Sequence, residues 1–116
     1  MDVLIVDDSA AIRKILRRVL QQAEIPLGQV YEAGDGLEAV AGLKQQKVQL
    51  ILSDINMPNM DGLQLLSELK GNVEWKDIPF CTLQKTYILR TALLPTVYLP
   101  VLVSAAKHLV VSEILE

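Results

Sequence analysis

The sequence has little of several residue types that mark common classes of protein. Among its 116 residues stands a single cysteine, Cys81, so no disulfide can form within the chain. Lysine and arginine total 11 against 14 aspartates and glutamates, the opposite of the basic face with which nucleic-acid binders neutralise phosphates. No apolar run reaches the roughly 20 residues that span a bilayer. We therefore expect neither direct binding of nucleic acid nor insertion into a membrane.

The amino-terminal residues lack a targeting signal. Met1, Asp2 and Val3 open the chain, with neither a basic region nor a cleavable apolar segment. Together with the single cysteine, this start predicts a location in the reducing cytoplasm. The length suits one domain around a buried core, so we predict a single domain over residues 1–116 with no output domain after it.

What the sequence does contain is a regular alternation of apolar runs and amphipathic stretches. Residues 3–6 are continuously apolar, which is typical of a strand buried on both faces of a parallel sheet. Ser9 then stands where it can cap a helix that ends near Pro26. Apolar residues recur along this helix at helical spacing, namely at Ile12, Ile15, Leu16, Val19 and Leu20.

Two further units of strand and helix are predicted. Residues 29–32 form the second strand, and Asp35, with Glu38 three positions later, caps a helix that runs towards Gln45. Residues 48–53 form the third strand. A loop and a short helix follow, and this helix has three leucines on one side: Leu63, Leu66 and Leu69.

Acidic residues follow the first and the third of these strands. Strands that alternate with helices predict an α/β fold with a parallel sheet and right-handed crossovers. In such folds, ligands bind beyond the carboxyl ends of the strands. Asp7 and Asp8 follow the first strand, and Asp54 follows the third. The sequence therefore predicts a functional site at which these three carboxylates meet.

This acidic cluster favours metal-assisted phosphoryl chemistry. Three carboxylates that converge on one point repel one another, and a divalent cation is the simplest way to offset the repulsion. Mg²⁺ prefers oxygen ligands, keeps several waters and commonly shares its shell with a phosphate. Asp8, Asp54 and the main-chain carbonyl of Asn56 would supply three protein oxygens. A phosphoryl group held there is oriented for in-line attack by a carboxylate, and Asp54 is our candidate nucleophile.

Each charged residue also has a purely structural interpretation. Aspartate alone is favoured at helix caps and turns, but two separate strands that both deliver carboxylates to one edge favour a site. Lone His108 has no metal ligand or nucleophile beside it in sequence, and we interpret it as structural. Four basic residues are interpreted as a solvated helix face, with a docking surface for an acidic partner as the alternative: Arg13, Lys14, Arg17 and Arg18.

Three segments match the pattern of one family. Residues 3–9 read VLIVDDS, residues 32–36 read EAGDG, and residues 53–62 read SDINMPNMDG. Over residues 1–80 the chain thereby resembles the receiver domains of bacterial response regulators, especially those of the chemotaxis type. The resemblance implies a flavodoxin-like fold, which is a doubly wound, five-stranded parallel sheet flanked by helices. It also implies a role in two-component signalling, with phosphorylation by a histidine kinase.

The resemblance further implies roles for individual residues. Asp54 would be the phosphoacceptor, and Asp8 would bind Mg²⁺ directly. Asp7 would hold the metal through water, and Asn56 would supply its main-chain carbonyl. The residues implied to shape the loop after the acceptor are Pro58 and Gly62.

The last third of the chain, residues 81–116, departs from the family pattern. We predict a fourth strand at residues 80–83, a fifth at residues 96–99, and a final helix from Ser104 to Leu115. Three explanations for the departure remain open. The chain could be a diverged receiver, an altered sequence such as one read in a shifted frame, or a rearranged fold with an exchanged segment.

The residues that would contact the phosphoryl group after transfer cannot be assigned in this third. The family pattern has a threonine or serine at the end of the fourth strand, but neither Thr82 nor Thr86 stands clearly in register. It also has a lysine before proline after the fifth strand, and here Leu99 precedes Pro100. Two lysines are candidates for the missing one, Lys85 and Lys107.

We therefore predict a phosphorylation-controlled interaction module rather than an enzyme with an external substrate. Its partners would be a histidine kinase and a downstream protein, such as a flagellar motor component or a phosphorelay protein. A pseudo-receiver that binds partners without phosphorylation is the first alternative. The second is a phosphatase of the haloacid-dehalogenase type, but Asn56 stands where that type needs an aspartate, and asparagine cannot exchange a proton in that role.

Overall fold

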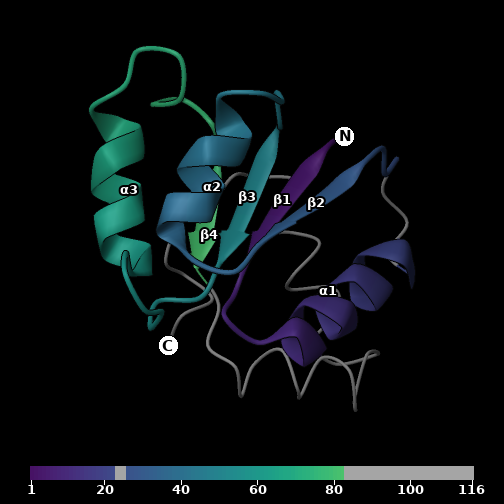
Figure 1. Cartoon of the computed structure of the whole chain (residues 1–116). Coiled ribbons are helices and arrows are strands. Elements are labelled where there is room, and N and C mark those ends of the chain that lie inside the picture. The colour runs from purple at the N-terminus through teal and green to yellow at the C-terminus, as the bar shows by residue number, and fades with distance from the viewer. Residues whose placement is uncertain (23–25, 83–116) are drawn as a thin grey trace.

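The structure, a computed structural model, describes residues 1–22 and 26–82. These residues form a parallel sheet of four strands in the order β2-β1-β3-β4, covered by three helices (Figure 1). The elements along the chain are β1 (Val3–Val6), α1 (Ala10–Gln22), β2 (Val30–Ala33), α2 (Gly36–Leu43), β3 (Leu50–Ser53), α3 (Gly62–Lys70) and β4 (Phe80–Thr82). Within the described ranges, no helix is long and apolar enough to cross a bilayer.

The strand order confirms the doubly wound parallel sheet. The chain passes from β1 outward to β2, returns past β1 to β3 and continues to β4, so the direction of winding reverses between β1 and β3. Figure 1 shows α1 on one face of the sheet and α2 and α3 on the other. This arrangement is flavodoxin-like, and ligands of such folds bind where the winding reverses. The predicted fifth strand and final helix lie outside the described residues.

Two apolar layers bury the two faces of the sheet. Below α1, the side chains of Val3 and Ile5 pack with Leu50 and Leu52. Because side chains alternate along a strand, the intervening strand residues pack against α2 and α3 on the other face. Each central strand is therefore buried on both sides, which explains why its apolar run in the sequence is continuous.

The caps predicted for the first two helices are present. Ser9 Oγ accepts a hydrogen bond from Ile12 N at 3.3 Å, and Asp35 Oδ1 accepts one from Glu38 N at 2.9 Å. The boundaries differ slightly from the prediction, since β2 lies one residue later, β3 begins two residues later and α2 ends at Leu43. Main-chain hydrogen bonds define where strands and helices end, and the pattern of apolar residues in the sequence does not reveal these bonds.

The predicted apolar side of α3 is wrong in its phase. Leu63 is exposed, whereas Leu65 and Leu69 are buried, with Leu66 partly buried beside them. Three residues turn a helix by about 300°, which is about 60° short of a full turn. Two such steps therefore leave Leu63 and Leu69 about 120° apart around the helix axis. Leu65 and Leu69 are four residues apart and share a face of the helix, and this face packs on the sheet.

Cys81 lies in the layer beneath α1. Its side chain is buried among the apolar residues of that layer. Burial raises the pKa of its thiol to about 11, because the charged thiolate loses its hydration there. The thiol therefore stays protonated at neutral pH, and a buried, protonated thiol is a poor nucleophile.

Two of the four basic residues of α1 have a structural role beyond forming a solvated face, because they pair with Glu32. Arg13 Nε lies 2.9 Å from one oxygen of Glu32, and Arg17 Nη2 lies 2.6 Å from the other. Arg17 also donates to the main-chain oxygen of Val30. These contacts fasten α1 to β2, and the sequence pattern did not show them because Glu32 is far from both arginines along the chain.

We expect Glu32→Gln to remove part of the acid sensitivity of folding. The hydrogen bonds from Arg17 and Arg13 lower the pKa of Glu32 below its ordinary value of 4.5. A lowered folded-state pKa stabilises the protein above pH 4.5, and this contribution is lost as the pH falls through the folded value. Between about pH 5 and pH 3, the free energy of unfolding should fall less steeply in the variant, by about 0.2–1 kcal/mol in total.

Urea unfolding at a series of pH values measures this difference. Glu68→Gln is the control, because Glu68 is an exposed residue of α3 with no ion pair among residues 1–22 and 26–82. Parallel pH profiles for wild type and Glu32→Gln would show that the two arginines do not stabilise the charged form.

Candidate functional site

The carboxyl ends of β1 and β3 meet at one edge of the sheet. The two strands pair in parallel with Val6 opposite Ser53, so Asp7 and Asp54 leave them at the same level. Asp54 N donates to Val6 O at 2.9 Å, and Asp7 N donates to the main-chain oxygen of Ala33 in β2 at 3.0 Å. The main chain of both aspartates thus belongs to the sheet, and their side chains start from fixed points.

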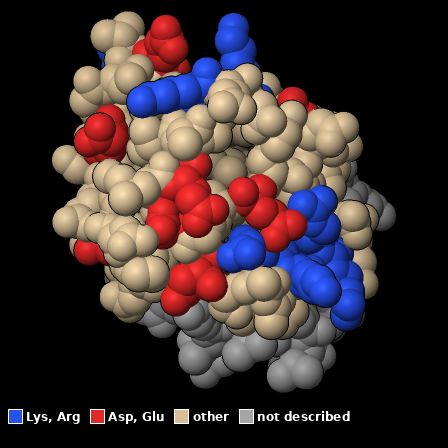
Figure 2. Space-filling model, in the orientation of Figure 1, with Lys and Arg blue, Asp and Glu red and all other residues tan. Residues whose placement is uncertain are grey.

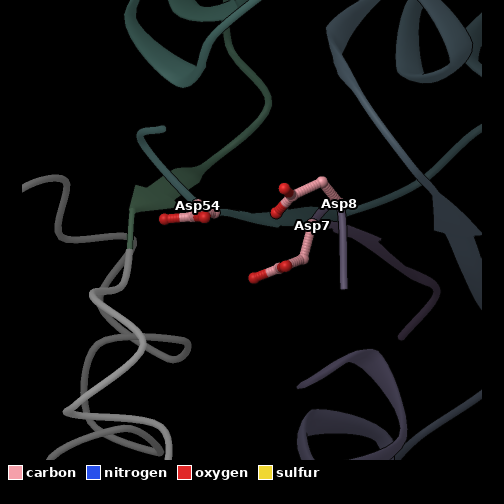
Figure 3. Close-up of side chains that lie close together, drawn as sticks. All are labelled: Asp7, Asp8 and Asp54. Carbon is pink, nitrogen blue, oxygen red and sulfur yellow. The ribbon is translucent and has the colours of Figure 1, made fainter. Parts of the chain in front are cut away.

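The three predicted carboxylates come together at this edge. One oxygen from each of Asp7, Asp8 and Asp54 lies within 4.8 Å of the other two. Figure 3 shows Asp7 and Asp8 reaching from the end of β1 toward Asp54. Asp7 and Asp54 are buried and Asp8 is exposed, so the cluster is open to solvent on the side of Asp8. The prediction that these residues meet is confirmed.

Main-chain amides orient two of the carboxylates. Ser9 N donates to Asp7 Oδ1, and Ile55 N donates to Asp54 Oδ1, both at 2.8 Å. Each bond restricts the rotation of the side chain that accepts it. The carboxylates are therefore held in place before any ligand binds, which lowers the reorganisation needed on binding.

Charges of both signs lie side by side on this part of the surface. Figure 2 shows acidic side chains near the middle of the face and basic side chains beside them. Arg13 Nη1 donates to the main-chain oxygen of Asp7, so one guanidinium of α1 lies next to the cluster. The carboxylate cluster therefore has a positively charged neighbour in Arg13.

The β3–α3 loop, residues 54–61, follows the candidate acceptor. Asn56 and Pro58 are exposed in it. At its end, Gly62 N donates to Ile55 O at 2.8 Å, and a Cβ on Gly62 would lie 2.3 Å from the main-chain oxygen of Asp54. Backbone atoms cannot give way as a flexible side chain can, so this close approach requires glycine.

Sequence reasoning missed a contact between this loop and α2. Asn59 Nδ2 donates to Asp35 Oδ2 at 2.7 Å, across 24 positions of the sequence. The backbone of Asn59 has a positive φ of 65°. Asparagine at a loop apex was the available signal, because asparagine adopts this conformation more readily than most residues.

Of the unassigned residues in the last third, the structure describes Thr82. It ends β4 opposite Ser53, one residue short of the level of Asp54. Its side chain is buried, and its Oγ1 has no hydrogen-bond partner in the part of the chain that the structure describes. The other candidates lie outside the described residues: Lys85, Thr86, Leu99, Lys107 and His108.

The acidic cluster fits a divalent metal ion. Carboxylate oxygens are the ligands that hard cations such as Mg²⁺ and Ca²⁺ prefer. Two oxygens bound to one Mg²⁺ are at most about 4.2 Å apart. The 4.8 Å limit on the separations in the cluster is therefore close to what one ion requires, and small side-chain rotations suffice to close it.

A flavodoxin-like α/β fold with a carboxylate cluster at the reversal of winding defines the class of this protein. Within that class, residues 3–96 match the family described as response regulator receiver domain. The chain belongs to this family, and receiver domains are modules of two-component signalling.

Curated relatives include a receiver of the chemotaxis type. Chemotaxis protein CheY-3 of Vibrio cholerae is 35% identical over 79 residues, which are 68% of this chain and 59% of CheY-3. The cyclic di-GMP phosphodiesterase response regulator RpfG of Xanthomonas campestris is 37% identical over 68% of this chain and 21% of its own length. The chain thus spans less than two thirds of either relative.

Solved structures show the same fold. Chemotaxis response regulator CheY4 of Vibrio cholerae has a TM-score of 0.71 at 27% identity, over 94% of this chain and 98% of CheY4. The Mn²⁺-bound form of response regulator Rcp1 has a TM-score of 0.63 at 36% identity, over 71% of this chain and 63% of Rcp1. The predicted flavodoxin-like receiver fold is therefore confirmed.

Proposed function

We propose that this receiver domain accepts a phosphoryl group on Asp54 from a histidine kinase and that phosphorylation controls its contacts with a downstream protein. The observation that carries the proposal is the convergence of Asp7, Asp8 and Asp54 within 4.8 Å at the ends of adjacent parallel strands. We place this activity in the cytoplasm and expect no external substrate.

The proposed metal is Mg²⁺, held by Asp8, Asp54 and the main-chain carbonyl of Asn56, with Asp7 acting through water. When bound, it would neutralise charge on the phosphoryl oxygens and on the cluster. The protein's own contribution is to hold the nucleophile. Ile55 N fixes one oxygen of Asp54, and the other forms the bond to phosphorus while the bond from phosphorus to the donor's leaving group breaks.

Incubation with Mg²⁺ and acetyl phosphate tests the proposal. Wild-type protein should gain the mass of one phosphoryl group, and alkali should release it, because an acyl phosphate is hydrolysed by base. Omission of Mg²⁺ should prevent the labelling. A stably folded wild-type chain that takes up no phosphoryl group would favour the alternative of a pseudo-receiver, whose contacts do not depend on phosphorylation.

We expect Asp8→Asn to weaken Mg²⁺ binding at least about tenfold, since even residues that only support metal ligands are commonly worth that much. The exposed position of Asp8 beside two buried carboxylates makes it the accessible side of the cluster. Isothermal titration calorimetry measures the affinity. Asp77→Asn removes the same charge from an exposed position outside the cluster, and it should bind Mg²⁺ like wild type. Equal affinity in Asp8→Asn and wild type would remove Asp8 from the set of ligands.

A further inference from the structure

One carboxylate joins the start of α2 to the β3–α3 loop. Asp35 Oδ1 accepts from Glu38 N at 2.9 Å and thereby caps α2. Its second oxygen, Oδ2, accepts from Asn59 Nδ2 at 2.7 Å. Asp35 is 8% exposed, so this bond is partly shielded from water. Hydrogen bonds to a charged acceptor are the stronger ones in proteins.

The main chain reinforces this link at the adjacent positions. Gly36 N donates to Met60 O at 3.1 Å, and a Cβ on Gly36 would lie 2.5 Å from Met60 Cγ. Met60 N in turn donates to Pro58 O at 2.7 Å, which closes a tight turn around Asn59. The apex of the loop is therefore fastened to the first turn of α2 by a side-chain bond and a main-chain bond.

The other end of the loop is fastened to the acceptor itself. Ile55 N donates to Asp54 Oδ1, and Gly62 N donates to Ile55 O, both at 2.8 Å. Asn56 lies between this anchored end and the anchored apex at Asn59. Its main-chain carbonyl is the proposed ligand whose position depends on the loop, whereas the main chains of Asp7 and Asp54 are hydrogen-bonded to the sheet.

We propose that Asp35 and Asn59 are positioning residues, whose hydrogen bond holds the β3–α3 loop, and with it the Asn56 carbonyl, in the conformation that binds the metal. This inference rests on the proposed function. Neither residue belongs to the proposed set of metal ligands. Their bond acts by removing conformational freedom that the loop would otherwise lose on binding, and such preorganisation raises affinity without adding a contact to the ligand.

Asn59→Gly tests the proposal with little disturbance of the backbone. Glycine adopts the positive φ of position 59 without strain, so the main consequence is loss of the bond to Asp35. We expect Mg²⁺ affinity, measured by calorimetry, to fall by about three- to tenfold. Asn72→Gly is the control, because the side chain of Asn72 also makes one hydrogen bond, accepting from Glu74 N at 2.8 Å, but lies outside the loop. It should leave the affinity unchanged.

An exchange of the two side chains supplies a rescue. Asn59→Asp alone sets two carboxylates against each other and should weaken Mg²⁺ binding, although it adds a negative charge near the site. Combining it with Asp35→Asn restores an amide-to-carboxylate hydrogen bond in the reverse direction, keeps the net charge and retains a capping side chain on α2. The double variant should bind Mg²⁺ within about twofold of wild type. Failure of the rescue would contradict the pairing.

Amide hydrogen exchange without metal measures directly how stable the contact between the loop and α2 is. In Asn59→Gly, the amide of Gly36, which bonds Met60 O, should exchange faster than in wild type, and in Asn72→Gly it should not. If wild type binds Mg²⁺ and Asn59→Gly binds it equally well, the positioning role is wrong while the proposed function stands. If wild type binds no Mg²⁺ at all, the proposed function fails and the positioning role fails with it.

Discussion

Asp54→Asn is expected to abolish phosphoryl transfer to the chain. An amide carries no negative charge on oxygen and delocalises the electron pair on nitrogen, so it cannot attack phosphorus as a carboxylate does. The substitution is nearly isosteric. The bond from Asp54 N to Val6 O and the bond from Ile55 N to the side-chain oxygen can both persist. Intact-mass analysis after treatment with acetyl phosphate and Mg²⁺ should therefore show no adduct in a folded protein.

Asp61→Asn is the matched control because it removes a carboxylate from the same loop. Asp61 caps α3, where its Oδ1 accepts from Gln64 N at 2.8 Å, and asparagine caps helices about as well as aspartate. This variant should be labelled like wild type. An adduct of equal yield in Asp54→Asn would exclude Asp54 as the acceptor.

Gly62→Ala is expected to cost about 1–3 kcal/mol of unfolding free energy, the usual range for inserting an atom into a closely packed place. The new Cβ would meet the main-chain oxygen of Asp54 at 2.3 Å and the Cα of Ile55 at 2.9 Å. Relief requires the loop to move away from the acceptor, so Mg²⁺ affinity should fall together with stability. Urea unfolding and calorimetry on one preparation measure both quantities.

Gly42→Ala provides the comparison. Gly42 lies in α2, and within residues 1–22 and 26–82 no atom outside its own helix turn lies within 4 Å of a Cβ added there. Alanine favours a helix over glycine by up to about 1 kcal/mol, so this variant should be as stable as wild type or slightly more stable. If Gly62→Ala behaved like Gly42→Ala, the close approach at the end of the loop would be wrong.

The fold of residues 1–22 and 26–82 was largely predictable because its elements obey local rules. The continuous apolar run of β1 reflects burial on both faces, and the helical spacing from Ile12 to Leu20 reflects one buried face of α1. Ser9 and Asp35 cap helices as their side chains allow. Leu63 shows the limit of such rules. The leucines of α3 can be placed on a helix face at a spacing of three or of four residues, and only packing on the sheet selects between the two faces.

The candidate site was predictable to the extent that it lies at strand ends. Asp7, Asp8 and Asp54 follow strands, and a parallel sheet brings such residues to one edge. The bond between Asp35 and Asn59 was not predictable, because it depends on how a loop and a distant helix pack. The roles assigned to the individual site residues remain predictions that the experiments above decide.

Because Cys81 is buried, the rate at which its thiol reacts can measure how often the protein opens locally. Thiol reagents attack the thiolate, and here the thiol is both covered by α1 and held protonated by its surroundings. A reagent can therefore modify it only in molecules whose layer beneath α1 has transiently opened. With one cysteine in the sequence, the rate of modification has a single origin. Following that rate with and without Mg²⁺ would reveal how far stabilisation of the carboxylate edge spreads through the sheet to β4.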